Sequence, residues 1–250
     1  MTLPPEFLDR PIAHRGLHDA QVPENSVAAA EAAIAAGYGI ELDIQHTADG
    51  TPVVFHDYDL TRLAGDEGFV ADLTTEELAD FRLGKSDQAI PLLSSYLKII
   101  DGRAPLLIEI KDQDGRLGEQ IGDLHLRVAE ALSGYKGPVA VMSFNPHVVA
   151  AFHKQAPDIA CGIVSCDYNE DDWPMIDDAT RSDLASLSMF DQSGASFVSH
   201  DHKDLANPAI TALRARGVPI LCWTIRSPEA EAQARTRCDN ITFEGYPAAT

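Results

Sequence analysis

Short apolar runs rich in β-branched residues alternate with amphipathic segments along nearly the whole chain, and this alternation limits the fold more than any other feature. The runs that we interpret as strands are 11–14, 39–44, 105–110, 138–143, 159–164, 196–199, 218–224 and 240–243. Most are separated by segments with helical spacing, at 26–36, 92–100, 119–132, 147–155, 209–216 and 229–235. Repeated strand and helix units of this kind form parallel sheets, because a helix carries the chain back to the start of the next strand.

Eight strands that alternate with helices close naturally into a barrel, and the 250 residues of this chain are a typical length for one. An open doubly wound sheet would more often carry a glycine-rich phosphate loop after its first strand, and the sequence contains neither GxGxxG nor GxxxxGK[ST]. We therefore predict an α/β fold, a (β/α)8 TIM barrel, as a single domain over residues 1–250. Asn25, Asn145 and Asn207 precede three of the predicted helices and are expected to cap them.

Residues 57–95 interrupt the alternation after the second strand. They follow a short apolar run, 52–55, and consist of a polar loop and the segment DLTTEELADFRL. Thr74 and Glu77 have the spacing of a capping box, which predicts a short helix. We expect this stretch to be a small insertion on the barrel rim.

The formal net charge of −20 disfavours anionic macromolecules as partners. We expect no nucleic-acid partner and no stable membrane association, and a small anionic substrate would need a local cation. The first residues lack the pattern of a signal peptide and no segment approaches ~18 continuous apolar residues, so we expect a cytoplasmic protein. The four cysteines lack CxxC spacing and are expected to be buried thiols. The sequence leaves the oligomeric state open.

Charged side chains end three of the predicted strands, where the active sites of such barrels lie. Glu41 and Asp43 are two residues apart and therefore share one face of the second strand. Glu109 and Lys111 share a face of the third in the same way. Three carboxylates inside a barrel repel one another unless a hard divalent cation neutralises them. The alternative is a buried set of ion pairs in which Arg15 and Lys111 balance these acids.

Two histidines suit proton transfer near neutral pH. His14 ends the first predicted strand and His56 follows the apolar run 52–55. Each has a charged neighbour, Arg15 or Asp57. A lone histidine is usually structural, but these positions favour a chemical role.

Other aromatic and imidazole side chains carry weaker signals. Trp223 ends the seventh predicted strand, where it could form an aromatic wall for a substrate or simply pack on the barrel. His200 and His202 follow the sixth and could reach a substrate or bond within their loop. His18 is expected to face solvent.

Together these motifs resemble the glycerophosphodiester phosphodiesterase family, in its cytoplasmic bacterial form. The elements that carry the resemblance occur in the family's order and are His14-Arg15-Gly16, Pro23-Glu24-Asn25, Glu41-x-Asp43, Asp49-Gly50, His56-Asp57, Leu60-x-Arg62, Pro91-x-Leu93, Glu109-x-Lys111, Ser143-Phe144 and Trp223-Thr224. The similarity extends over nearly the whole chain. Near the C-terminus Glu244 stands roughly where the family usually has aspartate, and we assign it no role.

The resemblance implies metal-dependent hydrolysis of glycerophosphodiesters to glycerol 3-phosphate and an alcohol. It implies that His14 and His56 are the general acid and base, that Arg15 and Lys111 hold the phosphate, and that one divalent ion, Mg²⁺, Ca²⁺ or Mn²⁺, binds at Glu41, Asp43 and Glu109. Two alternatives stay open. One is a lysophospholipase D or phospholipase-type activity on lipid phosphodiesters, against which the acidic rim segment argues, and the other is a non-catalytic barrel that binds phosphorylated ligands.

Overall fold

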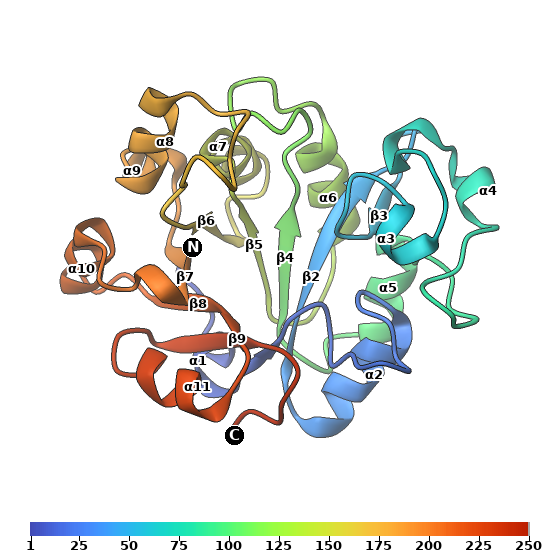
Figure 1. The fold of residues 1–250 in the computed structure, drawn as a ribbon, viewed down its shortest axis with the longest axis horizontal. Coiled ribbons are helices and arrows are strands. Elements are labelled where there is room, and N and C mark those ends of the chain that lie inside the picture. The colour runs from blue at the N-terminus through green and yellow to red at the C-terminus, as the bar shows by residue number, and fades with distance from the viewer. Residues whose placement is uncertain (250) are drawn as a thin grey trace.

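Eight parallel strands surround a common axis in the computed structural model, which describes residues 1–249 (Figure 1). The barrel strands are β1 (Ile12–Ala13), β2 (Gly39–His46), β4 (Leu106–Ile110), β5 (Val139–Ser143), β6 (Ala160–Ser165), β7 (Phe197–Asp201), β8 (Ile220–Ile225) and β9 (Asn240–Phe243). Each pairs in parallel with its neighbours, and β1 closes the barrel by pairing with both β2 and β9. The predicted (β/α)8 barrel is confirmed. β3 (Pro52–Val54) is an additional strand that runs antiparallel to the end of β2.

Helices connect most of the strands, and the longer ones pack around the outside of the barrel. They are α1 (Glu6–Asp9), α2 (Val27–Ala36), α3 (Thr61–Ala64), α4 (Thr75–Leu78), α5 (Leu93–Ile100), α6 (Leu124–Leu132), α7 (Pro146–Gln155), α8 (Asp178–Ala185), α9 (Phe190–Ser193), α10 (Pro208–Ala215) and α11 (Pro228–Ala234), with 3₁₀ turns η1 (Val70–Asp72) and η2 (His202–Asp204). Asn145 and Asn207 cap α7 and α10 as predicted. Ser26, not Asn25, caps α2, since its hydroxyl accepts the N–H of Ala29. Of the described residues, none lies in a helix both long and apolar enough to cross a membrane.

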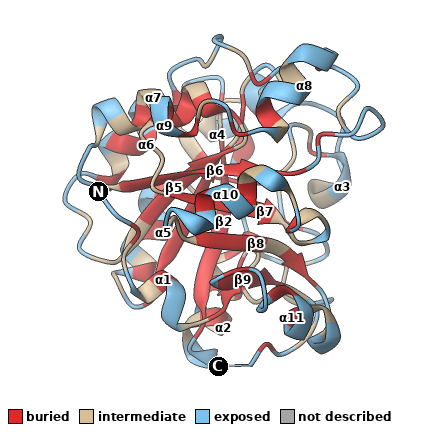
Figure 2. Ribbon diagram, turned by 90° about the vertical axis from the view of Figure 1, so that its left-hand side faces the viewer, coloured by how far each residue is buried: buried red, intermediate tan, exposed pale blue. Residues whose placement is uncertain are grey.

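Alternation along the strands produces two layers of core. In β2, Ile40, Leu42 and Ile44 face outward and join the main cluster beneath the helices. The barrel interior holds a second cluster that includes Leu107 and Phe197. Figure 2 shows the result, with largely buried strands inside helices that keep an exposed face. Successive residues of a strand point to opposite sides. The residues that alternate with the outward-facing ones, at the carboxyl ends of β2 and β4, must therefore point into the barrel.

The segment after β3 has a small core of its own. Leu60, Val70, Leu78 and Leu83 pack together against Phe55, beside the barrel. The capping box of Thr74 and Glu77 forms at the start of α4. The range predicted for the insertion, 57–95, includes the first turn of α5, a barrel helix that packs against α2 and β3.

Three local predictions differ from the structure. β1 is only two residues long, and the helix predicted over 119–132 begins at Leu124. The helix α8 was not predicted, because it buries little besides Leu184 and has no apolar stripe to detect.

Gly162 tests how tightly the barrel interior is packed. A Cβ at this position on β6 would lie 2.5 Å from the ring of Phe197, which is fully buried on β7. We predict that Gly162→Ala lowers the free energy of unfolding by about 1–3 kcal/mol, because overpacking forces the ring or the strand to shift. Urea denaturation measures this difference. Gly118→Ala is the control, since nothing lies within 4 Å of the Cβ that it adds; equal stability of the two variants would contradict the packing.

Candidate active site

A cavity of about 540 Å³ opens at the carboxyl ends of the barrel strands. Its lining includes every site residue predicted from the sequence, namely His14, Arg15, Glu41, Asp43, His56, Glu109, Lys111 and Trp223. Most come from strand ends that are far apart in sequence. Closure of the barrel therefore gathers them into one site.

Three carboxylates form the centre of this cavity. One oxygen from each of Glu41, Asp43 and Glu109 lies within 4.8 Å of the others, and all three side chains are buried. Asp43 on β2 is paired in register with Glu109 on β4. The Nζ of Lys111 lies 2.7 Å from the nearest oxygen of both Asp43 and Glu109.

These surroundings act differently on the individual carboxyl groups. Burial and the negative charges of Asp43 and Glu109 raise the pKa of Glu41 well above its usual value. Burial alone would also raise the pKa of Asp43, but neighbouring positive groups, Lys111 foremost, hold it well below its usual range. Glu41 is thus the group whose negative charge the protein leaves least compensated.

The donor set fits a hard divalent cation. Three carboxylate oxygens within reach of one point are the ligands that Mg²⁺ and Ca²⁺ prefer. Lys111 pairs with Asp43 and Glu109, whereas the only imidazole or cationic side chain within 4.0 Å of the Glu41 carboxylate, among the described residues, is the His14 ring, whose pKa is lowered by burial. Ion pairs alone therefore do not balance the cluster, which favours the metal site over the purely ionic alternative.

Each of the two predicted catalytic histidines forms a hydrogen bond between its Nδ1 and a carboxylate. His14 Nδ1 lies 2.5 Å from Glu244 Oε2, and His56 Nδ1 lies 2.6 Å from Asp57 Oδ1. A carboxylate accepts the Nδ1 proton, so the neutral ring keeps Nε2 as a proton acceptor. Burial lowers the pKa of His14, opposed in part by its bond to Glu244.

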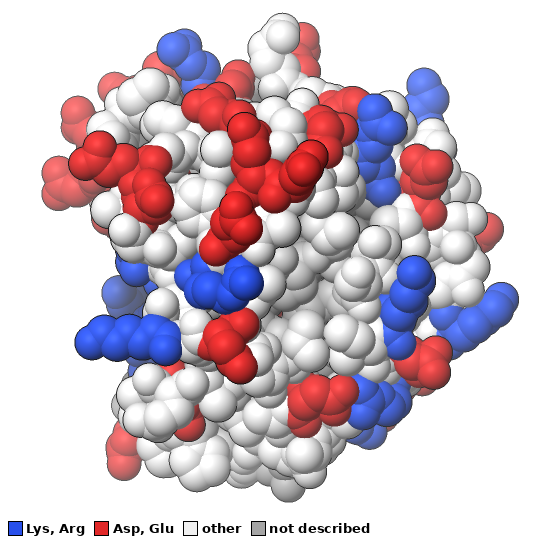
Figure 3. All heavy atoms as spheres, turned by 90° about the vertical axis from the view of Figure 1, so that its right-hand side faces the viewer, with Lys and Arg blue, Asp and Glu red and all other residues white. Residues whose placement is uncertain are grey.

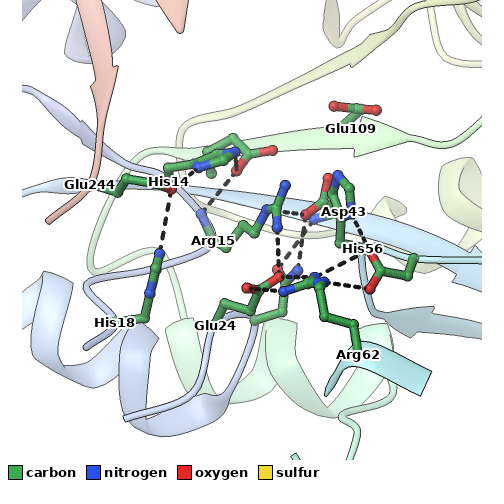
Figure 4. A network of polar contacts seen from close by, with 12 residues as sticks. His14, Arg15, His18, Glu24, Asp43, His56, Arg62, Glu109 and Glu244 are labelled. Carbon is green, nitrogen blue, oxygen red and sulfur yellow. Dashed lines mark hydrogen bonds and ion pairs between the residues drawn. The ribbon is translucent and has the colours of Figure 1, made fainter. Parts of the chain in front are cut away.

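A polar network links His56 to the metal-ligand candidates (Figure 4). Arg62 donates to both Asp57 and Glu24, at 2.7 Å each. Glu24 also accepts from Arg15 at 2.6 Å, and Arg15 Nε lies 3.4 Å from Asp43. Burial opposes the ionisation of Glu24, yet Arg62 and Arg15 lower the pKa of this carboxyl group to about 2. The network holds Arg15 at the edge of the cavity.

Residue types alone did not predict this network, although its members occur in the motifs that carry the family resemblance. Asn25 shows why the motif matters. It has a φ of 58°, in the left-handed region that asparagine tolerates, and its amide donates to Asp43 Oδ2 at 2.9 Å. Asn25 is therefore a support for Asp43 and not the cap that its position suggested.

Aromatic side chains form one wall of the cavity. Trp223 stacks edge-on against Phe144 with ring centroids 5.6 Å apart, and Trp173 lies 5.2 Å from the same ring. The indole N–H of Trp223 donates to the Ser199 carbonyl at 3.0 Å. Trp223 therefore both lines the cavity and packs on the barrel, and Trp173 comes from the loop after β6, where the sequence carried no signal.

The remaining histidines fall outside the cavity lining. His200 is fully buried and its Nδ1 lies 2.7 Å from the hydroxyl of Ser165, while His202 lies in η2. The prediction for His18 was wrong. Its side chain is only 22% exposed, and its Nε2 lies 3.6 Å from the carboxylate of Glu244, the residue that follows β9.

Residues 14–243 match the sequence model of the glycerophosphoryl diester phosphodiesterase family. The chain belongs to this family. It is therefore a phosphoric diester hydrolase by family, and the predicted resemblance is confirmed.

Relatives within the family align over most of their length. A glycerophosphodiester phosphodiesterase of Caldanaerobacter subterraneus subsp. tengcongensis is 30% identical, and the alignment covers 92% of this chain and 91% of that protein. The human glycerophosphodiester phosphodiesterase 1 is 26% identical over 86% of this chain and 71% of its own length.

Solved structures share the fold. An Oleispira antarctica phosphodiesterase, in complex with the product sn-glycerol-3-phosphate, superimposes with a TM-score of 0.78 at 23% identity, covering 96% of this chain and 94% of that one. A Thermotoga maritima glycerophosphodiester phosphodiesterase gives a TM-score of 0.71 at 22% identity, covering 93% and 92% of the two chains.

Glu41→Gln tests the charge imbalance directly. The pKa of Glu41 is higher in the folded protein than in the unfolded one. Glu41 therefore contributes its full stability at pH values below its unfolded-state pKa, and this contribution is lost as the pH rises through its folded-state pKa. At pH 7 in EDTA we predict that Glu41→Gln is more stable than the wild type, because the amide removes a buried negative charge that the neighbouring side chains do not balance.

Thermal unfolding measures both proteins with and without metal. Added Mg²⁺ or Mn²⁺ should raise the unfolding temperature of the wild type more than that of the variant, because binding to the folded state stabilises it. A variant less stable than the wild type in EDTA would contradict the account.

Proposed function

We propose that this protein hydrolyses glycerophosphodiesters to glycerol 3-phosphate and an alcohol, with one divalent ion at Glu41, Asp43 and Glu109. The observation that carries the proposal is the buried carboxylate cluster, which shares one cavity with two carboxylate-paired histidines. Family membership supports the reaction type. The product bound to the Oleispira antarctica phosphodiesterase supports glycerol 3-phosphate as a ligand of this fold.

The bound ion, Mg²⁺, Ca²⁺ or Mn²⁺, would supply Lewis-acid polarisation of the phosphate and acidify a nearby hydroxyl. Arg15 and Lys111 line the same cavity and carry the positive charge that an anionic phosphate needs. Arg15 pairs with Glu24 and Lys111 with Asp43, so a phosphate oxygen would compete for donors that are already oriented. Trp223 and Phe144 would exclude water beside the glycerol or the alcohol group.

His14 and His56 would move the protons. One ring accepts the proton of the attacking hydroxyl through Nε2, and the other donates a proton to the leaving alcohol. Glu244 and Asp57 each accept the Nδ1–H of their histidine, so a negative charge lies beside each ring when it becomes an imidazolium.

The 2-hydroxyl of the glycerol is the nucleophile that we favour. It is adjacent to the phosphate, and attack from within the substrate has the effective-molarity advantage of an intramolecular reaction. Its oxygen bonds to phosphorus as the alcohol oxygen leaves with a proton. The resulting cyclic phosphate is then opened by water to give glycerol 3-phosphate.

An activity panel tests the function and its rivals together. With Mg²⁺, Ca²⁺ or Mn²⁺ present we expect turnover of glycerophosphodiesters, and in EDTA we expect turnover to be abolished because the carboxylates lose their common ion. A lysophospholipid in the same panel tests the lipid-directed alternative. The rim segment after β3 presents acidic side chains, which Figure 3 shows gathered over the upper part of that face, and these disfavour an anionic lipid surface.

Three outcomes of the panel would overturn parts of the proposal. Full activity in EDTA would remove the metal from the mechanism. Faster turnover of the lysophospholipid than of any glycerophosphodiester would favour the lipid alternative. Binding of glycerophosphodiesters without turnover under every metal condition would favour the non-catalytic barrel.

Removal of either histidine should affect the rate and leave binding intact. We predict that His14→Ala and His56→Ala each lower kcat by about 10² to 10⁴, the usual range for losing one general acid or base. Steady-state kinetics give kcat, and calorimetry with a slowly cleaved analogue gives affinity. A folded variant with near wild-type turnover would return that histidine to a structural role.

A substrate without the 2-hydroxyl tests the nucleophile. We predict that the 2-deoxy analogue binds but is barely cleaved, because water must be positioned separately in its place. Competition against the natural diester measures its binding, and phosphorus NMR measures its cleavage. Equal rates for the two substrates would show that water attacks directly and would leave the metal and histidine assignments unchanged.

A further inference from the structure

Glu244 lies at the point where the two ends of the barrel sheet meet. It directly follows β9, and the carbonyl of Phe243 before it accepts the backbone N–H of His14 at 2.9 Å. Its own N–H donates to the carbonyl of Ile225 at the end of β8. Backbone bonds to two other strand ends therefore fix the position of Glu244 relative to His14.

The two carboxylate oxygens of Glu244 have different partners. Oε2 lies 2.5 Å from His14 Nδ1 and 3.6 Å from His18 Nε2 (Figure 4). Oε1 accepts from Arg226 Nε at 2.7 Å. The side chain is only 20% exposed. With one oxygen held by Arg226, the carboxylate cannot turn away from the imidazole without losing an ion pair.

From this geometry we propose that Glu244 is the positioning residue of His14: it holds the ring in the Nδ1–H tautomer with Nε2 directed to the carboxylate cluster. In that orientation His14 Nε2 lies 4.0 Å from Glu41 Oε2. The inference rests on the proposed function only for its kinetic consequence. The tautomer and its cause are properties of the protein alone.

A second histidine in the same cavity has the same arrangement. Asp57 accepts from His56 Nδ1 with one oxygen, and Arg62 binds the carboxylate through its Nε and a terminal nitrogen. Each of the two histidines that line the cavity is therefore paired with a carboxylate, and each carboxylate is in turn paired with an arginine. A carboxylate fixed by arginine restricts the imidazole more strictly than a free carboxylate, because both of its oxygens have assigned donors.

Glu244→Gln should reverse the tautomer of His14. Arg226 has only donors, so it would take the amide oxygen of the glutamine and leave the NH₂ group facing His14 Nδ1. His14 Nδ1 would then have to accept a hydrogen bond from this NH₂ group. The ring proton would move to Nε2, where it blocks proton transfer from a substrate. The loss should fall between the ~10-fold effect of removing an orienting partner and the ~10⁴-fold effect of a wrong tautomer.

The test combines nitrogen-15 NMR with kinetics in Mg²⁺. At a pH where the ring is neutral, we expect His14 of the wild type to carry its proton on Nδ1 and that of Glu244→Gln on Nε2. We expect kcat of the variant to fall at least tenfold while KM stays within twofold, and Glu244→Asp, which keeps the carboxylate, to retain the wild-type tautomer. Glu231→Gln is the matched control, because it also removes an arginine-paired carboxylate but on α11, and its kcat should stay within twofold.

Several results would overturn the inference. A wild-type His14 protonated on Nε2 would do so without any variant, even if Glu244→Gln failed to fold. An unchanged tautomer in Glu244→Gln would do so too, as would a changed tautomer with kcat within twofold of the wild type. If the wild type hydrolyses no glycerophosphodiester, the proposed function fails, and the NMR measurement still decides the role of Glu244.

Discussion

The mutual repulsion of three buried carboxylates is the constraint on which the rest of the site depends. Glu41, Asp43 and Glu109 have oxygens within 4.8 Å of one another at buried positions, where charges interact more strongly than they do in water. The protein answers with Lys111 between Asp43 and Glu109 and with Arg15 beside Asp43. These contacts leave Glu41 without an adjacent cationic side chain. In the proposed function a divalent ion would complete the balance, and it would supply the charge and acidity that phosphodiester hydrolysis needs.

Such a cluster can persist only in a rigid fold, and the barrel supplies that rigidity. The outward residues of β2 and β4 are buried beneath helices, so a one-residue slip of either strand would exchange apolar and charged faces. The apolar outer layer thereby fixes the direction of the carboxylates. Stability and function occupy alternate residues of the same strands, and the cost of grouping the charges is offset by the core around them.

Much of this could be predicted from local pattern. The apolar runs gave the strands, and charged residues that end those runs gave the cavity lining, because both signals lie within a few neighbouring residues. Contacts between distant residues could not be predicted in this way. His14 and Glu244 are 230 positions apart and meet only because β1 and β9 close the barrel. Glu24 and Arg62 have ordinary neighbours in sequence, and their pairing across 38 positions has no periodic signal. Asn25 has the local signature of a helix cap, but its tertiary contact with Asp43 prevails.

We propose that one divalent ion binds among Glu41, Asp43 and Glu109. The most direct test is a crystal soaked in Mn²⁺ and measured at a wavelength where manganese scatters anomalously. The account predicts a single strong anomalous peak bounded by oxygens of these three side chains. A cavity without such a peak at saturating Mn²⁺, with Lys111 still bridging Asp43 and Glu109, would contradict it and leave the cluster as a set of buried ion pairs.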